Sequence, residues 1–163
     1  MKALLKFVLG IVACLVLALV VLRITGLNPH GRTPGLWLTG NLVTTPVTDW
    51  SFTNKILTDE VQTRTWYLIP HSVTTYCVAY NGQLYLDSIY RGNIEYPHGR
   101  SWNENVARDP HVRIKLGNQL YDRTLVYVTD PAERAAVLQA KTKKYPLLKI
   151  PAGATVQIFR VIG

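Results

Sequence analysis

Arg91 and Arg100 are the residues whose type and spacing best suit binding chemistry. Arg100 directly precedes Ser101, and Glu104 follows three residues later, which is the pattern of a capping box at the start of a short helix. A helix N-terminus offers unpaired N–H groups and a positive dipole end, and guanidinium groups bind phosphate oxygens in pairs. This corner therefore predicts a phosphate-binding site. The alternative is that both arginines lie on an ordinary surface or in salt bridges.

The common catalytic motifs are absent from the sequence. It contains no G-x-S-x-G, H-E-x-x-H, C-x-x-C, P-loop or G-x-G-x-x-G pattern, so hydrolase, metalloprotease, thioredoxin and Rossmann functions have no support. The four histidines are far apart, and a metal or haem site built from His71 and His98 is an alternative to plain surface roles. We predict no metal site, and the sequence identifies no catalytic residue and leaves open whether the protein is an enzyme.

The N-terminal segment predicts a membrane anchor. From Ala3 to Leu22 the only charge is Lys6, and 20 helical residues span about 30 Å, the thickness of the hydrocarbon layer. A cleaved signal peptide and lipidation at Cys14 are the alternatives. We predict a single-pass anchor in the cell membrane with the lipid bilayer as a partner. The flanking basic residues are balanced, and the N-terminal amine slightly favours a periplasmic or extracytoplasmic domain.

The rest of the chain is basic. Of 18 basic residues, Lys2, Lys6 and Arg23 belong to the anchor, which leaves 15 against 10 acidic residues. A basic domain beside a membrane indicates attraction to anionic headgroups or to an anionic ligand. Nucleic acid is not predicted as a partner, because there is no Lys/Arg run, zinc-finger spacing or helix-turn-helix pattern. Cys77 is the only cysteine outside the anchor, so no disulfide forms within the domain.

Short runs rich in β-branched and aromatic residues predict a sheet after a Gly- and Pro-rich lead-in over residues 27–46. The expected strands are 63–69, 74–80, 83–88, 111–116, 119–129 and 155–162. Asn81-Gly82 and Gly117-Asn118 predict two tight hairpins, because these residues tolerate positive φ. In the strand 111–116, apolar and basic residues alternate, which predicts one core face and one basic face.

Two helices interrupt the strands. The first begins at Ser101 and ends before Asp109-Pro110, and the second begins at Asp130-Pro131 and ends at Tyr145-Pro146. The order is three strands, a helix, two strands, a helix and a strand. The predicted class is mainly β (α+β), with an anchor over residues 1–23, a linker over 24–46 and one domain over 47–163.

This order of elements and several local motifs resemble a known family over Trp37 to Tyr145. The motifs are Asp49-Trp50-Ser51-Phe52, Pro70-His71-Ser72-Val73-Thr74, Gly82-Gln83-Leu84-Tyr85-Leu86, and Ala107 through Gly117. The stretch is similar to the split β-barrel flavoproteins, the pyridoxamine-phosphate-oxidase-like superfamily that includes deazaflavin-dependent nitroreductases. The resemblance implies a split β-barrel with two short helices, preceded by the transmembrane helix.

The resemblance also implies a flavin at a dimer interface, with its phosphate held near the third strand and the following loop. The corresponding cofactor-binding positions are Ser88, Arg91, Arg100, Ser101, Trp102 and Asn103. The implied cofactor is FMN or the deazaflavin coenzyme F420, and a barrel without a cofactor is the alternative. Trp102 could stack on the flavin ring, or it could serve core packing or a dimer contact.

Two functions follow as hypotheses. In the first, a membrane-anchored flavin- or deazaflavin-binding protein reduces a lipid-soluble substrate such as a quinone, because the tether holds the pocket beside the bilayer. In the second, the barrel is an interaction module in a non-catalytic accessory subunit of a larger membrane protein complex. The expected assembly is a homodimer or that larger complex.

Overall fold

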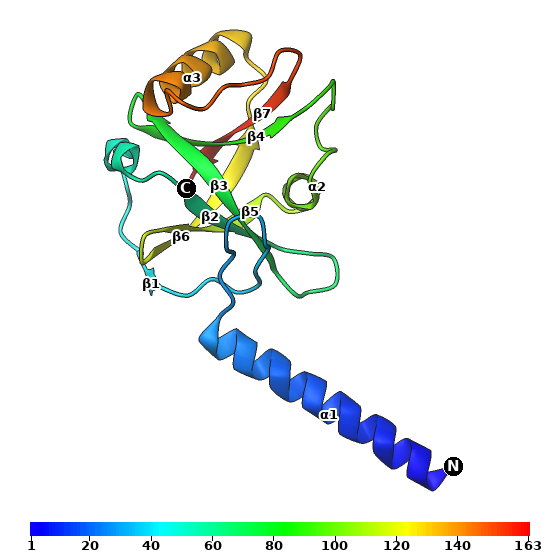
Figure 1. Cartoon of the computed structure of the whole chain (residues 1–163). Helices are drawn as coiled ribbons and strands as arrows, with labels where there is room; N and C mark the ends of the chain where they lie inside the picture. Colours follow the sequence, from blue (N-terminus) through cyan, green and yellow to red (C-terminus); the bar gives the residue numbers. More distant parts are fainter.

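A computed structural model describes all 163 residues as a small barrel at the end of one long helix (Figure 1). The helices are α1 (Lys2–Thr25), a 3-10 turn η1 (Ser51–Lys55), α2 (Ser101–Arg108) and α3 (Pro131–Lys144). The strands are β1 (Asn41–Leu42), β2 (Asp59–Thr63), β3 (His71–Tyr80), β4 (Gln83–Tyr90), β5 (His111–Leu116), β6 (Gln119–Tyr127) and β7 (Thr155–Ile162). The predicted class, mainly β with two short helices after an apolar one, is confirmed.

Strands β2 to β7 form a six-stranded antiparallel barrel. The sheet order is β1-β6-β5-β2-β3-β4-β7, and a further pairing of β6 with β7 closes the barrel. The two-residue β1 adds to β6 in parallel. Closure leaves β6 and β7 with partners on both sides, which removes most exposed edges.

The barrel wall opens between β3 and β4. Their pairing runs from Tyr80↔Gln83 to Tyr76↔Asp87 and stops there. Beyond that point β3 pairs with β2, whereas β4 pairs with β7 as far as Tyr90↔Thr155. The two strands therefore diverge, and residues 73–76 and 87–89 on their facing edges line a cleft.

Two apolar clusters lie on opposite faces of the sheet. The inner cluster fills the barrel with side chains such as Leu86 and Phe159, and α2 contributes Trp102 and Val106 to it. The outer cluster packs beneath α3, whose Val137 is buried. Alternation along each strand separates the two sets, so α3 covers the outside of the barrel while α2 contributes to its interior.

The N-terminal ends of α2 and α3 show which of the two predicted helix starts is correct. Asp130 caps α3 as predicted: its carboxylate accepts a 2.7 Å hydrogen bond from the Glu133 amide, and Pro131 takes the first helical position. The predicted capping box of α2 is wrong. That helix already includes Ser101, so Arg100 is the N-cap residue, and no side chain caps it.

Both hairpin turns have the backbone that the sequence predicts. Asn81 and Gly82 have φ angles of 48° and 74°, and Gly117 has a φ of 62°. Left-handed residues match the right-handed twist of the strands that such turns connect.

The predicted strand over 63–69 is wrong. The strand β2 ends at Thr63, and residues 64–69 form a loop in which Trp66 and Leu68 are exposed. Residues 59–63 instead make the strand, because partners on both sides, β3 and β5, override the weak strand preference of its acidic residues. Burial in the barrel decided this element, not local propensity.

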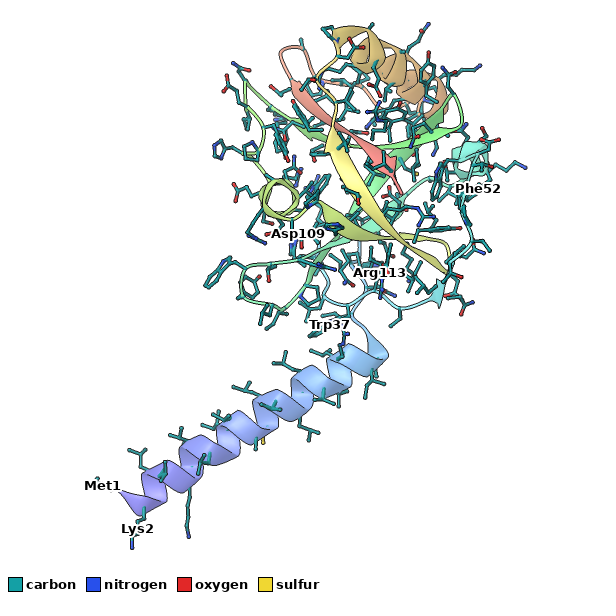
Figure 2. The ribbon with its side chains drawn as sticks, turned by 180° about the vertical axis from the view of Figure 1, so that it is seen from behind. Met1, Lys2, Trp37, Phe52, Asp109 and Arg113 are labelled. Carbon is teal, nitrogen blue, oxygen red and sulfur yellow. The ribbon has the colours of Figure 1, made fainter.

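The helix α1 is long and apolar enough to cross a membrane. Its 24 residues include a window of mean hydropathy 2.9, and none of its side chains is buried. At 1.5 Å per residue it is about 36 Å long, against about 30 Å for the hydrocarbon layer. Figure 2 shows Lys2 at its far end and Trp37 beside the end that joins the barrel. A signal sequence would pass the same test.

The segment after α1 folds into a hairpin-like loop, residues 27–37, which we call the finger loop. Leu27 donates to the Trp37 carbonyl at 2.9 Å, and Leu36 donates back to the Leu27 carbonyl at 2.7 Å. Near the tip, His30 and Thr33 exchange two backbone hydrogen bonds. Gly35 exchanges another two with Ser72 of β3. The lead-in is thus bound to β3 instead of extending freely from the barrel.

Candidate functional site

A cleft of about 930 Å³ opens where β3 and β4 diverge. Its walls are residues 73–76 of β3 and 87–89 of β4, together with the tip of the finger loop, residues 31–34. Arg91, Arg100, Trp102, Leu148 and Lys149 complete the lining with Thr58. The split in the barrel wall and the folded lead-in therefore make the cleft together.

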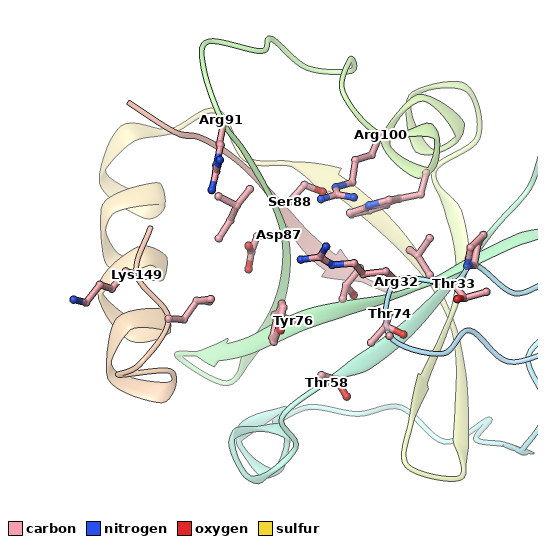
Figure 3. A pocket seen from close by; sticks show the side chains of 17 residues that line it. Arg32, Thr33, Thr58, Thr74, Tyr76, Asp87, Ser88, Arg91, Arg100 and Lys149 are labelled. Atoms are coloured by element: carbon pink, nitrogen blue, oxygen red, sulfur yellow. The ribbon is translucent and has the colours of Figure 1, made fainter. Parts of the chain in front are cut away.

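Three arginines from two separate segments extend into this cleft (Figure 3). Arg32 comes from the finger loop, and Arg91 and Arg100 come from the loop between β4 and α2. The guanidinium groups of these three make no hydrogen bond and no ion pair within the protein. Every other arginine of the barrel does: Arg64, Arg113 and Arg160 pair with carboxylates, and Arg108, Arg123 and Arg134 donate to backbone carbonyls.

The only carboxylate in the cleft lining is already neutralised. Asp87 is buried and forms an ion pair with Lys141 of α3, which is also buried. Burial raises the pKa of Asp87, and the Lys141 charge opposes that shift. The positive charge of the three arginines and of Lys149 is therefore not balanced by any carboxylate of the cleft, which favours binding of an anion there.

Close packing positions Arg100. Its guanidinium lies over the Tyr90 ring, 5.8 Å from the centroid. The preceding Gly99 has a φ of 109°, and a Cβ there would lie 2.4 Å from a carbon of the same ring. Only glycine allows this approach of the backbone to Tyr90, which turns the Arg100 side chain toward the cleft.

A buried chain of amides and a hydroxyl fixes the loop that carries Arg91 and Arg100. Ser88 donates to the Asn103 side-chain oxygen at 3.0 Å, and the Asn103 amide donates to the Gln157 side chain. Gln157 in turn donates to the carbonyls of Ile94 and His98, at 3.1 and 3.2 Å. A fully satisfied buried network of this kind rigidifies its surroundings. Ser88 and Asn103 therefore hold the loop that carries the cationic groups.

A buried carboxylate lies behind the β3 wall of the cleft. Thr75 donates to Asp59 Oδ2 at 2.7 Å, while Asp59 Oδ1 has no partner. The pKa of Asp59 is raised to about 6, mainly because burial disfavours its charged form. Nearby, burial raises the pKa of the Cys77 thiol to about 12, which makes it an unreactive core group.

Two solved structures match this chain with TM-scores of 0.51. One is from Bacteroides thetaiotaomicron and is named a candidate 5-nitroimidazole antibiotic resistance protein; it is 17% identical, over 81% of this chain and 88% of that one. The other is a conserved hypothetical protein from Mycobacterium tuberculosis, 15% identical, over 69% of this chain and 76% of that one. An F420-H2-dependent reductase is 20% identical over 72% of this chain and 98% of its own, with a TM-score of 0.45.

The fold is a split β-barrel. The resemblance seen in the motifs is thus confirmed at the level of fold. No family model and no curated protein matches the sequence.

In this split barrel, four of the six predicted cofactor-binding residues line the cleft: Ser88, Arg91, Arg100 and Trp102. Ser101, on the exposed start of α2, and the fully buried Asn103 do not. Trp102 is 2% exposed and packs against Phe159 at 5.1 Å, which matches the core-packing alternative for this residue.

Sequence reasoning missed Arg32 and Tyr76. Arg32 lies in a Gly- and Pro-rich segment that gave no sign of folding back onto the barrel. Tyr76 lines the cleft and is 43% exposed, so it is the accessible aromatic ring that Trp102 is not. Its place at the last β3–β4 pair could be known only from the strand register.

Proposed function

We propose that the cleft binds a phosphate-bearing cofactor of the flavin class, FMN or a deazaflavin, and that the protein is a membrane-anchored reductase. The observation that carries this proposal is the convergence of Arg32, Arg91 and Arg100, whose guanidinium groups make no hydrogen bond or ion pair within the protein. Unpaired guanidinium groups aimed into one cleft are costly to bring together unless an anion joins them, because like charges repel.

The cleft residues fit such a group. Guanidinium groups give paired hydrogen bonds to phosphate oxygens, and about 930 Å³ is within the size range of cofactor pockets. The exposed ring of Tyr76 offers an aromatic surface for a planar ring system. The cofactor would supply hydride chemistry, while the residues of this chain bind it, orient it and limit access of water.

The anchor and the finger loop support a lipid-soluble substrate such as a quinone. The loop begins two residues after α1 ends at Thr25, and its tip forms one wall of the cleft. If α1 spans the bilayer, this connection holds the cleft beside the membrane surface. A substrate dissolved in the bilayer then reaches the site without leaving the membrane environment.

A homodimer stays a prediction from the family resemblance. Light scattering of the detergent-solubilised full chain, corrected for bound detergent, distinguishes one copy from two. A chain found only with other membrane proteins after gentle solubilisation would favour the accessory-subunit hypothesis.

Titration of the purified full chain in detergent tests the proposal. FMN, FAD and coenzyme F420 are added separately, and binding is followed by cofactor fluorescence. The variants Arg91→Gln and Arg100→Gln each remove one charge-assisted contact worth about 1.5–3 kcal/mol, which corresponds to roughly 10- to 150-fold weaker binding.

Lys143→Gln is the matched control. Lys143 is an exposed cation of α3 that has no ion pair and does not line the cleft, so its loss changes the net charge equally. Unchanged affinity in this variant, with weaker binding in the two arginine variants, is the expected result. A protein that binds none of the three cofactors would exclude the proposal.

A further inference from the structure

The loop between β2 and β3 presents three large apolar side chains to the outside. Trp66 and Leu68 are 78% and 92% exposed, and Tyr67 between them is also exposed. Leu68 has a φ of 68°, a left-handed conformation that is unfavourable for leucine. The structure thus holds an apolar side chain outward at a cost in backbone energy, instead of burying it.

This loop lies beside the end of α1. A second cavity, of about 740 Å³, is lined by Arg23 and Trp37 on one side and by Thr65 and Leu68 of the loop on the other. The barrel end that carries Asp109 and Arg113 faces α1 in Figure 2. The apolar loop is therefore placed where the membrane-spanning helix leaves the barrel.

The lining of the same cavity is basic. It includes five arginines, Arg23, Arg64, Arg108, Arg113 and Arg123, against two aspartates, Asp109 and Asp122. Each aspartate already pairs with an arginine. Arg23, in the last turn of α1, makes no ion pair and lies 5.7 Å from the centre of the Trp37 ring. Positive charge and exposed aromatic residues next to a membrane helix are typical of the part of a membrane protein that lies at the membrane–water interface.

We infer that Trp66, Tyr67 and Leu68, with Arg23, Arg64 and Arg108, form a docking face that binds the surface of a bilayer rich in anionic phospholipid. The three apolar side chains enter the headgroup region beside α1, and the arginines bind lipid phosphates. This contact fixes the orientation of the barrel on the membrane, so that the finger loop and the cleft keep one position relative to the bilayer. The inference rests on α1 as a membrane span and goes beyond cofactor binding.

Spin labels at two matched leucines test the docking face. Leu68→Cys places a label on the loop, and Leu147→Cys places one on an equally exposed leucine, 94% accessible, after α3. The helix α3 lies at the end of the barrel opposite α1 (Figure 1). Both variants carry Cys14→Ala, while Cys77 can stay, because it is buried in the core. The full chain is reconstituted into vesicles of phosphatidylcholine alone and into vesicles that also contain phosphatidylglycerol.

Collision of the label with oxygen, which concentrates in lipid, and with a water-soluble nickel complex reports its depth. In vesicles with phosphatidylglycerol, we expect several-fold more oxygen collision and less nickel collision at position 68 than at 147. Equal water exposure at both positions would overturn the docking face. Equal lipid exposure of position 68 in both vesicle types would overturn the role of the arginines. Neither readout depends on a bound cofactor, so failure here is separate from failure of the proposed function.

Discussion

Replacing Asp59 by asparagine should stabilise the protein at neutral pH. The Asp59 carboxylate is fully buried, and one of its oxygens has no hydrogen-bond partner. Thr75 donates to the other oxygen and would do the same for the amide oxygen of asparagine. The substitution keeps the shape and this hydrogen bond, and it removes the charge that burial disfavours.

The size of the effect follows from the pKa. The Asp59 pKa is about 6 in the folded protein, against 3.8 for the free side chain. This difference corresponds to about 3 kcal/mol. Because the folded state binds the proton more tightly, the stability of the wild-type protein falls as the pH rises from about 4 to about 6. Above this window the whole penalty is present, and below it the penalty is absent.

Thermal unfolding of the full chain in detergent, followed by tryptophan fluorescence, measures this. At about pH 8 we expect Asp59→Asn to unfold roughly 6–12 °C above wild type, at 2–4 °C per kcal/mol for a chain of this size. At about pH 4 most of this difference should be gone, because Asp59 is then neutral in the folded protein and its unfolded pKa of 3.8 lies close to that pH.

The control is Glu95→Gln, which replaces an exposed carboxylate that has no ion pair. It should show no such pH-dependent difference from wild type. A gain from Asp59→Asn that is equal at both pH values would refute the reasoning, since only titration of Asp59 produces the difference. A loss of stability at about pH 8 would show that the charged form makes a contact that favours folding.

Three further predictions concern the cleft. Lys141→Met leaves the buried Asp87 without its ion-pair partner and should cost about 3–5 kcal/mol of stability. Adding Asp87→Asn should recover most of this loss. Chemical denaturation of the single and double variants measures both effects. Asn103→Ala removes the hydrogen-bond partner of Ser88 and should cost about 2–4 kcal/mol of stability. It should also speed amide hydrogen exchange in residues 91–100. Unchanged exchange would contradict the role of Asn103 in holding that loop. Gly99→Ala should cost about 1–3 kcal/mol through its left-handed backbone and the clash with a tyrosine ring, and wild-type melting would argue against that packing.

The sequence predicted the elements whose local pattern agrees with their burial. The alternation of apolar and basic residues predicts the strand 111–116 with the bounds that the structure has, and Asp130-Pro131 predicts the start of α3. The expected strand 63–69 is wrong because Trp66, Tyr67 and Leu68 are exposed in the structure. If the docking face binds lipid, a bilayer supplies the burial that the barrel does not.

The cleft was only partly predictable, because it depends on contacts between distant segments. Arg91 and Arg100 were found from their position beside a helix start. The split itself requires the β3–β4 pairing to end at Tyr76, which no local motif specifies. Arg32 reaches the site only because the backbone of Gly35 pairs with Ser72, and a Gly-Pro-rich segment carries no signal for such a bridge.

The central claim, that the arginines of the cleft hold a phosphate group, is tested most directly by comparing FMN with riboflavin. The two have the same ring system and differ in the phosphate. We predict that the full chain binds FMN at least about 100-fold more tightly, because two or more charge-assisted contacts are lost with riboflavin. The difference should shrink in high salt. Equal affinity for FMN and riboflavin would contradict the account, as would a chain that binds neither of them and no coenzyme F420.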